Sequence, residues 1–358
     1  MEKSLFISWV DKYFPGLTVR VVETLNGADR AASYLHRSML RKEESVDGKY
    51  ESISADNINV VADVVAMDSS LPLKQRVAIS SASGEIPKMG MELKLNENQL
   101  TALDTLVAKG ASDSQIIAKL FADTPRCISG IYEQNEAIFL QGLSSGVALV
   151  ESNNVGSGVR VDYGYKAANV TGVPVIWSNV AANTLTDIST KISFAAESGR
   201  TITNILMDRA TLNRLKGSNE GKALYAASIG NFGTAAIPTT NQFLAAFSDE
   251  YGAAINIVER SVTYEKNGIK TAIKPWTLGA VIFLTSLEVG SLVWAKLAEM
   301  NHPDGNVTYS IVDDFILVSK YRLNRPSLAE FTSSQARVLP VIANVDSIFV
   351  LNTLTVQA

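Results

Sequence analysis

The stretch from Ile255 to Leu284, INIVERSVTYEKNGIKTAIKPWTLGAVIFL, combines strand-forming segments with a tight turn and a very apolar run. The pair Asn267–Gly268 lies between two such segments and predicts a two-residue β-hairpin turn, because both residue types accept positive φ angles. Pro275 then separates the hairpin from Val281–Leu284, which predicts a buried strand. The neighbouring residues offer almost no catalytic chemistry, so the stretch predicts the rigid core of a sheet.

Length and composition indicate a folded chain and exclude several classes of protein. The 358 residues are 46% hydrophobic and carry a net charge of −4, so a sizeable core is expected and a basic nucleic-acid-binding stripe is not. The single cysteine, Cys127, excludes an intrachain disulfide and a cysteine-rich metal site. No apolar run reaches the roughly 18 residues of a membrane span, and the start MEKSLFISWVDKYF lacks the pattern of a secretory signal. We expect no contact with a membrane.

Residues 1–46 are expected to form an arm that contains short helices. Large apolar side chains crowd the first part of this arm, and a terminus of this kind is usually held against another surface. Two surfaces remain open at this point, namely the body of the same chain and a neighbouring copy. The candidates for contact with a neighbouring copy are Phe6, Trp9 and Phe14.

Residues 47–93 predict an extended β-loop. Strand-like pieces alternate there with polar, serine-rich turns, and the pattern of core positions is weak. Long connections of this kind are uncommon in compact domains and often functional. We expect the loop to pack on a surface outside its own fold. Its candidate contact residues are Val60, Val61, Val64, Val65 and Leu71.

The clearest helical region spans residues 95–146. Thr124 as N-cap and Pro125 at the first helical position predict a helix that continues to Leu143, roughly 30 Å long at 1.5 Å per residue. Strands and helices follow in mixed order, then the long alternation of residues 306–323 and two closing strands within residues 336–356. The predicted fold class is α+β, because the elements do not form a regular βαβ repeat.

Catalytic and metal-binding patterns are weak throughout the chain. The GLSSG of residues 142–146 matches a nucleophile elbow, but an elbow needs a strand before it and a helix after it, and the predicted order is the reverse. The only histidines are His36, expected on a solvated helix face, and His302, expected in an exposed turn. Asp313–Asp314 falls in a predicted strand, where neighbours point to opposite faces. We predict no catalytic residue, no cofactor site and no metal site, and we do not expect an enzyme.

The order of elements resembles the major capsid proteins of tailed bacteriophages, above all the lambda shell protein family (major capsid protein E), which has the Hong-Kong-97-type capsid fold. The residues that carry the resemblance are Ile255–Glu259, Asn267–Gly268, Pro275, Val281–Leu284, Gly290, the closing turn Asn344–Asp346 and the segment GEIPKM at Gly84–Met89. The likeness runs from about residue 50 to the end as order and spacing. Trp276 departs from it, since small residues are common there in the family, and the arm has no counterpart.

The resemblance implies how the chain is divided. Residues 1–46 would be an N-terminal arm that reaches over a neighbouring subunit, and residues 47–93 the extended E-loop. A discontinuous P-domain, with the long spine helix, would comprise residues 94–175 and 297–335. A discontinuous A-domain would comprise residues 176–296 and 336–358. The segment NRPSLAEF would lie near three-fold contacts, with Arg325 and Pro326 as further candidates for contact between subunits.

The resemblance also implies a function and partners. The chain would be the major capsid protein of a tailed bacteriophage virion, assembled in the host cytoplasm into an icosahedral shell of hexamers and pentamers around double-stranded DNA. Further expected partners are separate scaffolding, portal and decoration proteins, with DNA nearby but bound without specificity. The N-terminal residues do not show the long charged coiled-coil pattern of a fused scaffolding domain. We therefore expect the scaffold to be a separate protein. No residues can be assigned to a covalent cross-link, so none is expected.

Three alternatives remain open on the sequence. An encapsulin-like bacterial compartment would use the same fold around protein cargo. A tail or baseplate protein would also be rich in strands and prone to assemble. A small-molecule enzyme of α+β class would need a polar cluster in a pocket, and the sequence indicates none.

Overall fold

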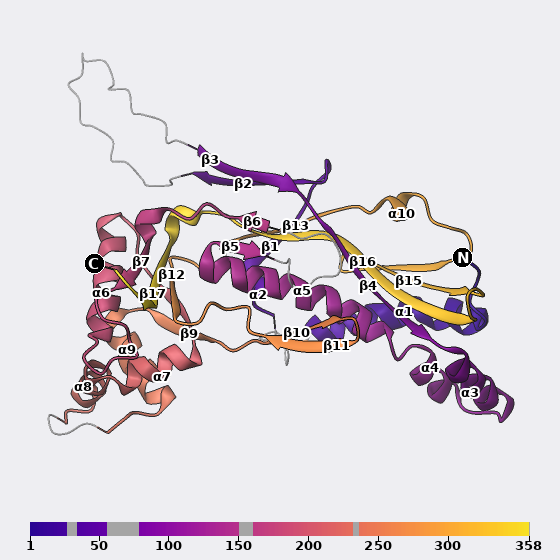
Figure 1. The fold of residues 1–358 in the computed structure, drawn as a ribbon, viewed down its shortest axis with the longest axis horizontal. Coiled ribbons are helices and arrows are strands. Elements are labelled where there is room, and N and C mark those ends of the chain that lie inside the picture. The colour runs from indigo at the N-terminus through magenta and orange to yellow at the C-terminus, as the bar shows by residue number, and fades with distance from the viewer. Residues whose placement is uncertain (27–33, 56–78, 150–159, 232–235, 358) are drawn as a thin grey trace, which may run out of the picture. The chain divides into compact units, whose positions relative to one another are not determined.

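The computed structural model describes residues 1–26, 34–55, 79–149, 160–231 and 236–357 (Figure 1). The chain divides into two compact units, each assembled from segments that are far apart in the sequence. Unit 1 comprises residues 1–50, 83–138 and 291–341, and unit 2 comprises residues 51–82, 139–290 and 342–358. The mixture of helices and strands confirms the predicted α+β class.

A six-stranded sheet forms the centre of unit 1. Its strands follow the order β1 (Leu40–Glu44), β13 (Gly290–Ala295), β16 (Ala329–Ile342), β15 (Ile316–Leu323) and β14 (Thr308–Val312), and β4 (Lys88–Leu95) also pairs with β16. Strands β14, β15 and β16 pair antiparallel in sequence order, as segments joined by short connections do. The alternation of residues 306–323 is therefore a hairpin, β14 and β15, as the sequence predicts.

The helices of unit 1 lie where the sequence shows helical spacing. They are α1 (Ile7–Asn26), α2 (Leu35–Met39), α3 (Glu97–Ala108), α4 (Asp113–Leu120), α10 (Ala298–Asn301) and the first part of α5 (Thr124–Ser145). Capping boxes begin two of them, because Asn96 and Gln99 satisfy each other's backbone N–H groups at α3, and Ser112 and Gln115 do so at α4. The predicted helix of residues 124–143 is α5, which continues past residue 138 into unit 2.

Unit 2 contains a five-stranded sheet of mixed direction. Its order is β7 (Val170–Val173), β17 (Ile348–Val356), β12 (Ala280–Leu284), β8 (Asn204–Asp208) and β9 (Ala254–Val258). The central strand β12 is antiparallel to both neighbours, whereas β7 with β17 and β8 with β9 are parallel pairs. The helices are α6 (Thr184–Glu197), α7 (Arg209–Gly217), α8 (Asn219–Ser228) and α9 (Thr240–Tyr251).

Strand β12 is the centre of the core of unit 2. All five of its residues are buried, as the apolar run predicts. Val281 and Phe283 join a cluster that also contains Phe349 of β17 and Phe243 and Phe247 of α9. The cluster draws further side chains from α6, α7 and β8, so these helices cover one face of the sheet. The apolar run of the sequence therefore identifies the strand on which unit 2 is built.

The hairpin predicted at Asn267–Gly268 is present but stands apart from that sheet. Strands β10 (Val262–Lys266) and β11 (Ile269–Ile273) pair only with each other among the described strands. Asn267 has a φ of 54° and Gly268 a φ of 77°, as a type I′ turn requires. Most side chains of the ribbon are exposed, so its role differs from the expected rigid sheet core.

Short elements complete the structure. They are the pairs β2 (Lys49–Ala55) with β3 (Ile79–Glu85) and β5 (Val147–Leu149) with β6 (Arg160–Asp162), and the 3-10 turns η2 (Ala167–Asn169) and η3 (Val345–Ser347). The strand predicted in VPVIWSN is limited to Val173, because Pro174 cannot continue the ladder. The predicted closing turn is η3, and it connects β16, mostly in unit 1, to β17 in unit 2.

Candidate assembly surfaces

The apolar stripe of α1 packs within unit 1. Phe6, Val10 and Phe14 are buried, and the ring of Phe14 stacks on Phe121 at 5.9 Å between centroids. Thr18, one turn further along α1, shares a 2.7 Å hydrogen bond with the hydroxyl of Ser310 in β14. Phe6 and Phe14 are therefore covered by their own unit, and their contact with a neighbouring copy stays a prediction. The helix continues through Pro15 to Asn26, longer than expected, so its apolar side chains recur at helical spacing and reach the body of their own unit.

Trp9 lies on the border of this stripe. It remains partly exposed and stacks on Tyr13, with centroids 6.0 Å apart. The hydroxyl of Tyr13 donates to Asp113 at the start of α4 at 2.7 Å, which fixes this face of α1. A half-covered indole is the kind of side chain that interfaces use as an anchor. Contact between Trp9 and a neighbouring copy stays a prediction.

Five of the predicted contact residues, Val60, Val61, Val64, Val65 and Leu71, lie outside the described residues. The base of the same loop is fixed in unit 1 by Arg337 of β16. Its guanidinium donates to the carbonyl of Ile86 at 3.1 Å and to that of Gly48 at 3.0 Å. Figure 1 shows β2 and β3 side by side as the ribbon that starts from this base. The predicted role of the loop between subunits stays a prediction.

The loop between β15 and β16 is exposed, as a contact surface must be. Arg325 and Pro326 both face solvent, and a cis peptide bond joins them. Close by, the backbone groups of Glu2 and Arg322 form two hydrogen bonds. The N–H of Glu2 donates to the carbonyl of Arg322 at 3.1 Å, and the N–H of Arg322 donates to the carbonyl of Glu2 at 3.0 Å, so the start of the chain is fixed to β15. Contact between subunits at Arg325 and Pro326 stays a prediction.

The two adjacent aspartates act together, contrary to the prediction from strand alternation. Asp313 and Asp314 form the turn between β14 and β15 with φ angles of 53° and 71°, so the strand geometry does not apply to them. Both carboxylates contact the ammonium of Lys42, at 2.6 and 2.8 Å. Burial of Lys42 acts to lower its pKa, but these hydrogen bonds outweigh it and raise the pKa above its ordinary value.

The side chain of Asp313 also anchors the hairpin turn to α5. It accepts a 2.6 Å hydrogen bond from the hydroxyl of Tyr132, whose ring lies under the guanidinium of Arg37. Burial, the charge of Asp313 and this hydrogen bond raise the pKa of Tyr132 well above its usual range. The cluster therefore joins α2, β1, α5 and the β14–β15 turn through side chains that are paired in the native state.

His36 is buried, which corrects the prediction of a solvated helix face. Its Nδ1 lies 2.6 Å from Glu136 of α5, and the same carboxylate accepts the backbone N–H groups of Leu35 and His36. Both side chains are almost fully buried. The partner is a hundred residues away in the chain, so sequence alone gives no sign of it. His302 is exposed in a turn, as expected.

A lysine at the core of unit 1 is a second feature that the sequence does not indicate. Lys320 of β15 is fully buried, with its ammonium bonded to the carbonyl of Leu120 at 3.1 Å and to Thr332 at 3.0 Å. Burial lowers the pKa of Lys320 to about 8, although Glu330 opposes the shift. The alternating pattern of β15 predicts that position 320 faces inward, but a lysine at that position would normally be expected on the surface.

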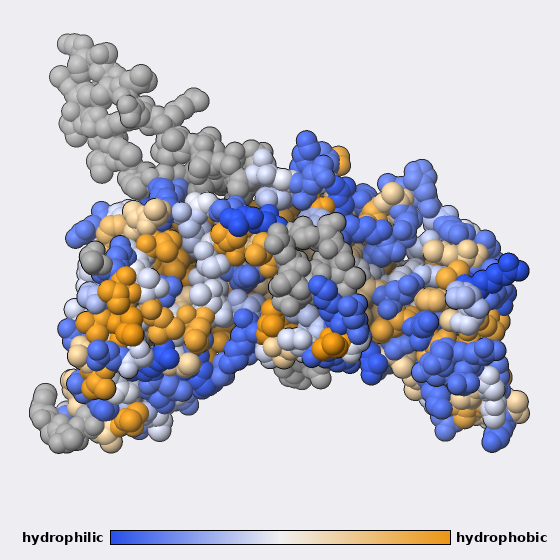
Figure 2. Space-filling view, viewed as in Figure 1, coloured by the Kyte–Doolittle hydropathy of each residue, from blue (hydrophilic) through white to orange (hydrophobic). Residues whose placement is uncertain are grey.

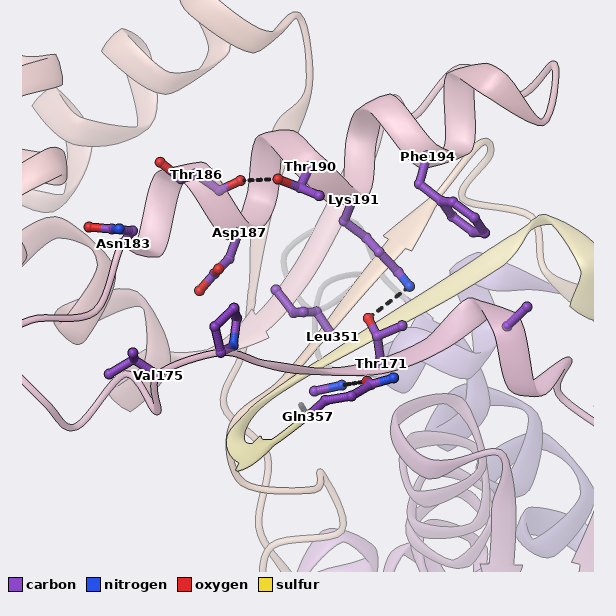
Figure 3. Close-up of a pocket in the computed structure, with 13 residues that line it drawn as sticks. Thr171, Val175, Asn183, Thr186, Asp187, Thr190, Lys191, Phe194, Leu351 and Gln357 are labelled. Carbon is purple, nitrogen blue, oxygen red and sulfur yellow. Dashed lines mark hydrogen bonds between the residues drawn. The ribbon is translucent and has the colours of Figure 1, made fainter.

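Unit 2 contains a pocket between α6 and the edge strand β7, with a volume of about 430 Å³ (Figure 3). Helix α6 contributes a stripe of side chains at helical spacing, Asn183, Thr186, Asp187, Thr190, Lys191 and Phe194. The opposite wall comes from Thr171, Gly172, Pro174 and Val175, with Leu351 and Gln357 of the final segment. The sequence predicts the helix and its apolar face, but not that Lys191 is turned beneath it.

Metal sites and membrane-spanning helices are absent from the part of the chain that the structure describes. Within that part, no group of three or more histidine, cysteine, aspartate or glutamate side chains is arranged to hold a metal ion. Among the helices of the same residues, none is long and apolar enough to span a bilayer. Cys127 is buried, and burial raises the pKa of its thiol to about 12.

Large apolar side chains remain exposed in unit 2, and Figure 2 shows them between polar ones on the visible face. The most exposed are Val180, Ile229, Ile237, Ile269, Leu278 and Val356. Ile269 belongs to the β10–β11 ribbon, and Leu278 to the segment between this ribbon and β12. Single apolar residues are normal on any surface, whereas a contiguous patch marks an interaction site.

No family model matches the sequence, and no curated protein matches it. Solved structures do match. A prophage protein of E. coli CFT073 that is assigned as a capsid protein aligns over 94% of this chain and 98% of its own, at 10% identity and a TM-score of 0.57. A phage-related protein from Bordetella bronchiseptica RB50 aligns over 96% and 98%, at 9% identity and a TM-score of 0.48. The capsid of cyanophage A-1(L) aligns over 89% and 91%, at 14% identity and a TM-score of 0.45. The first of these likenesses shows that the fold is shared over nearly the whole chain.

Proposed function

We propose that this chain is the major capsid protein of a tailed bacteriophage, and that its copies assemble into the icosahedral shell that encloses the genome. The observation that carries the proposal is the fold shared with the E. coli prophage protein over 94% of this chain and 98% of that one. A fold alone does not determine a function. Because the likeness spans nearly the full length of both chains, however, it leaves no large part for a separate domain.

The construction of both units supports a role as a building block. Polar contacts such as the ion pair of Lys42 with Asp313 and the hydrogen bond of His36 with Glu136 connect elements that are distant in the sequence. Such contacts fix the shape of a subunit, and a closed shell requires that repeated interfaces meet at constant angles. In this proposal, the paired polar side chains of unit 1 make the subunit rigid.

The proposed contacts between subunits use three surfaces. They are the extended loop of residues 47–93, the exposed turn at Arg325 and Pro326, and the half-buried face of Trp9. A standard interface buries about 1,600 Å² in total, so several repeated contacts per subunit give a shell a large collective stability. In this proposal hexamers and pentamers form in the host cytoplasm and become part of the virion, and scaffolding, portal and decoration functions reside in other proteins.

The charge of the chain suits the proposed contents of the shell. A net charge of −4 gives the wall no strong attraction for phosphate groups. Packaged DNA would lie near the wall without being bound tightly, and it could leave when the genome is released. The proposal therefore includes proximity to double-stranded DNA and no sequence-specific contact with it.

Sedimentation velocity of the purified full-length chain tests the proposal. We expect a fast-sedimenting population of many copies in equilibrium with small oligomers. Reversal of charge by Arg325→Glu should shift the distribution toward small oligomers, because the exposed turn would then repel its partner surface. Lys109→Glu, an exposed change at the end of α3 outside the proposed contacts, is the matched control. A chain that sediments as a monomer at every concentration would overturn the proposal.

A further inference from the structure

The pocket of unit 2 contains an ammonium group that the described residues leave largely unpaired. Lys191 is only 5% exposed, and its Nζ donates one hydrogen bond, to the hydroxyl of Thr171 at 2.9 Å (Figure 3). The same Nζ lies 5.2 Å from the centroid of the Phe194 ring. An ammonium group has three N–H donors, so one hydroxyl satisfies only part of it. A buried charge in this state is costly unless an anion joins it.

The nearest carboxylate in the pocket has a different partner. Asp187 lies one helical turn before Lys191, the spacing at which aspartate and lysine usually pair. Its carboxylate instead accepts a 2.8 Å hydrogen bond from the indole of Trp177. Burial raises the pKa of Asp187, although this hydrogen bond opposes the shift, and the charge of Glu220 adds to it. Lys191 is therefore available to an anion that enters from outside.

The rest of the lining determines which anion fits. Pro174, Val175, Leu351 and the Phe194 ring supply apolar walls around a volume of about 430 Å³, within the range of pockets that hold small organic molecules. Asp187 and Lys191 are the only charged side chains among the lining residues. A phosphate group carries more charge than one lysine balances, and phosphate sites usually use the planar fork of arginine. One ammonium group and apolar walls suit a single carboxylate on an apolar body.

We propose that this pocket is a binding site for a small amphiphilic monocarboxylate, with the carboxylate on Lys191 and the apolar chain along α6 toward Val175. In this position the ligand supplies the two hydrogen-bond acceptors that Lys191 lacks. Nothing in this inference depends on the proposed shell, because every lining residue belongs to unit 2. The site would give the subunit a small ligand in addition to its contacts with other subunits.

Isothermal titration calorimetry of the full-length chain with decanoate tests the inference. We expect saturable binding of one decanoate per chain. Decanol and decylamine have the same apolar chain with a neutral and a cationic head, so both should bind at least about tenfold more weakly if the ammonium group anchors the ligand. Binding is counted per chain, so a failure of shell assembly would leave this test unaffected.

Two variants separate the anchor from the cavity. Lys191→Met removes the ammonium group and should weaken decanoate binding by about tenfold or more, to the level of decanol. Lys222→Met, on α8 outside the pocket, removes the same charge and should leave binding unchanged. Thr190→Phe fills the pocket from an exposed position on α6, so the fold should tolerate it, and it should abolish binding of both decanoate and decanol.

The pH dependence provides an independent readout of the same anchor. Burial lowers the pKa of Lys191 to about 8, so the ammonium form is present at pH 7 and largely lost at higher pH. Between pH 7 and about pH 9.5 the affinity for decanoate should fall by about thirtyfold, whereas that for decanol should not change. Equal binding of decanoate and decanol, an unchanged affinity in Lys191→Met, or unchanged binding in Thr190→Phe would each overturn the proposal.

Discussion

Gly279 precedes the central strand of unit 2 in a conformation that other residues rarely adopt. Its φ is 79°, and a Cβ atom built there would lie 2.7 Å from the side chain of Leu354 and 2.9 Å from that of Thr353. Gly279→Ala therefore adds backbone strain to a steric overlap at the edge of β12. We expect a loss of about 2–3 kcal/mol in the free energy of unfolding, measured by denaturant titration.

Gly217 at the end of α7 is the matched control for this substitution. It has no positive φ, and a Cβ atom there would meet nothing within 4 Å. Gly217→Ala should be neutral or stabilise the chain by up to about 1 kcal/mol, since alanine has less freedom in the unfolded state. Equal effects of the two substitutions would show that the backbone at Gly279 is not constrained as described.

Lys191 should make stability depend on pH in the alkaline range. Its pKa is lowered by burial to about 8, so between pH 8 and about 10.5 the unfolded chain binds more protons than the native one. The free energy of unfolding therefore rises with pH across this window, and the contribution of one such lysine is about 3 kcal/mol. Urea titrations at a series of pH values measure it, and Lys191→Met should reduce the slope.

Lys222→Met provides the comparison for this measurement, because it removes the same charge from a half-buried position on α8 outside the pocket. Lys320, with a pKa also lowered to about 8, should maintain part of the pH dependence in the Lys191→Met variant. A slope that is identical in Lys191→Met and in the unmodified chain would contradict the burial of an ammonium group in the pocket.

At the scale of elements, the β14–β15 turn depends on the carboxylate of Asp313. Asp313→Ala removes the acceptor for Lys42 and Tyr132 and places alanine at a φ of 53°. We expect a loss of about 3 kcal/mol in unfolding free energy. Asp313→Asn tolerates the left-handed backbone and can still accept from Tyr132, so it should cost only about 1 kcal/mol. Chemical denaturation monitored by circular dichroism distinguishes the two.

Asp314 provides the internal control for this turn. Its side chain is 66% exposed, so its ion pair with Lys42 should be screened by solvent, and Asp314→Asn should change stability by less than about 0.5 kcal/mol. If Asp314→Asn proved as destabilising as Asp313→Ala, the turn would depend on total charge and not on the buried carboxylate.

Helix α1 is expected to contribute to folding through one face and to assembly through another. Phe14 is fully buried, so Phe14→Ala should lower the melting temperature and cost about 3 kcal/mol in unfolding free energy. Trp9 is only half-buried, so Trp9→Ala should cost about 1 kcal/mol and should weaken assembly more than folding. A Trp9→Ala chain that assembles normally would remove this residue from the proposed contacts.

Sequence predicts the elements of this chain better than it predicts their partners. Local signals were sufficient for α5, for β12 and for Asp208, which caps α7 by accepting from Thr211 at 2.8 Å. They failed at His36, whose partner Glu136 is distant in the chain, and at Asp313, where a turn replaces the expected strand. The pocket was also missed, since an amphipathic pattern gives no sign that Lys191 lies under the apolar edge of α6. Pairing over long distances depends on the three-dimensional fold.

At the scale of the whole molecule, the predicted four-part division stays a prediction. Contacts within the chain define two units, with boundaries at residues 50/51, 82/83, 138/139, 290/291 and 341/342. The expected arm, residues 1–46, lies wholly within unit 1, because α1 packs on α4 and β14. The contacts with neighbouring copies through the loop of residues 47–93, the turn at Arg325 and Trp9 stay predictions.

Electron microscopy of the negatively stained, purified chain tests the shell proposal most directly. We expect closed isometric particles and ring-shaped oligomers, with mixed particle sizes when the chain is expressed without a scaffolding protein. Tubes or stacked rings would indicate a tail or baseplate protein, and shells filled with protein cargo an encapsulin. Isolated single subunits at every concentration would contradict the claim that this fold is built to meet copies of itself.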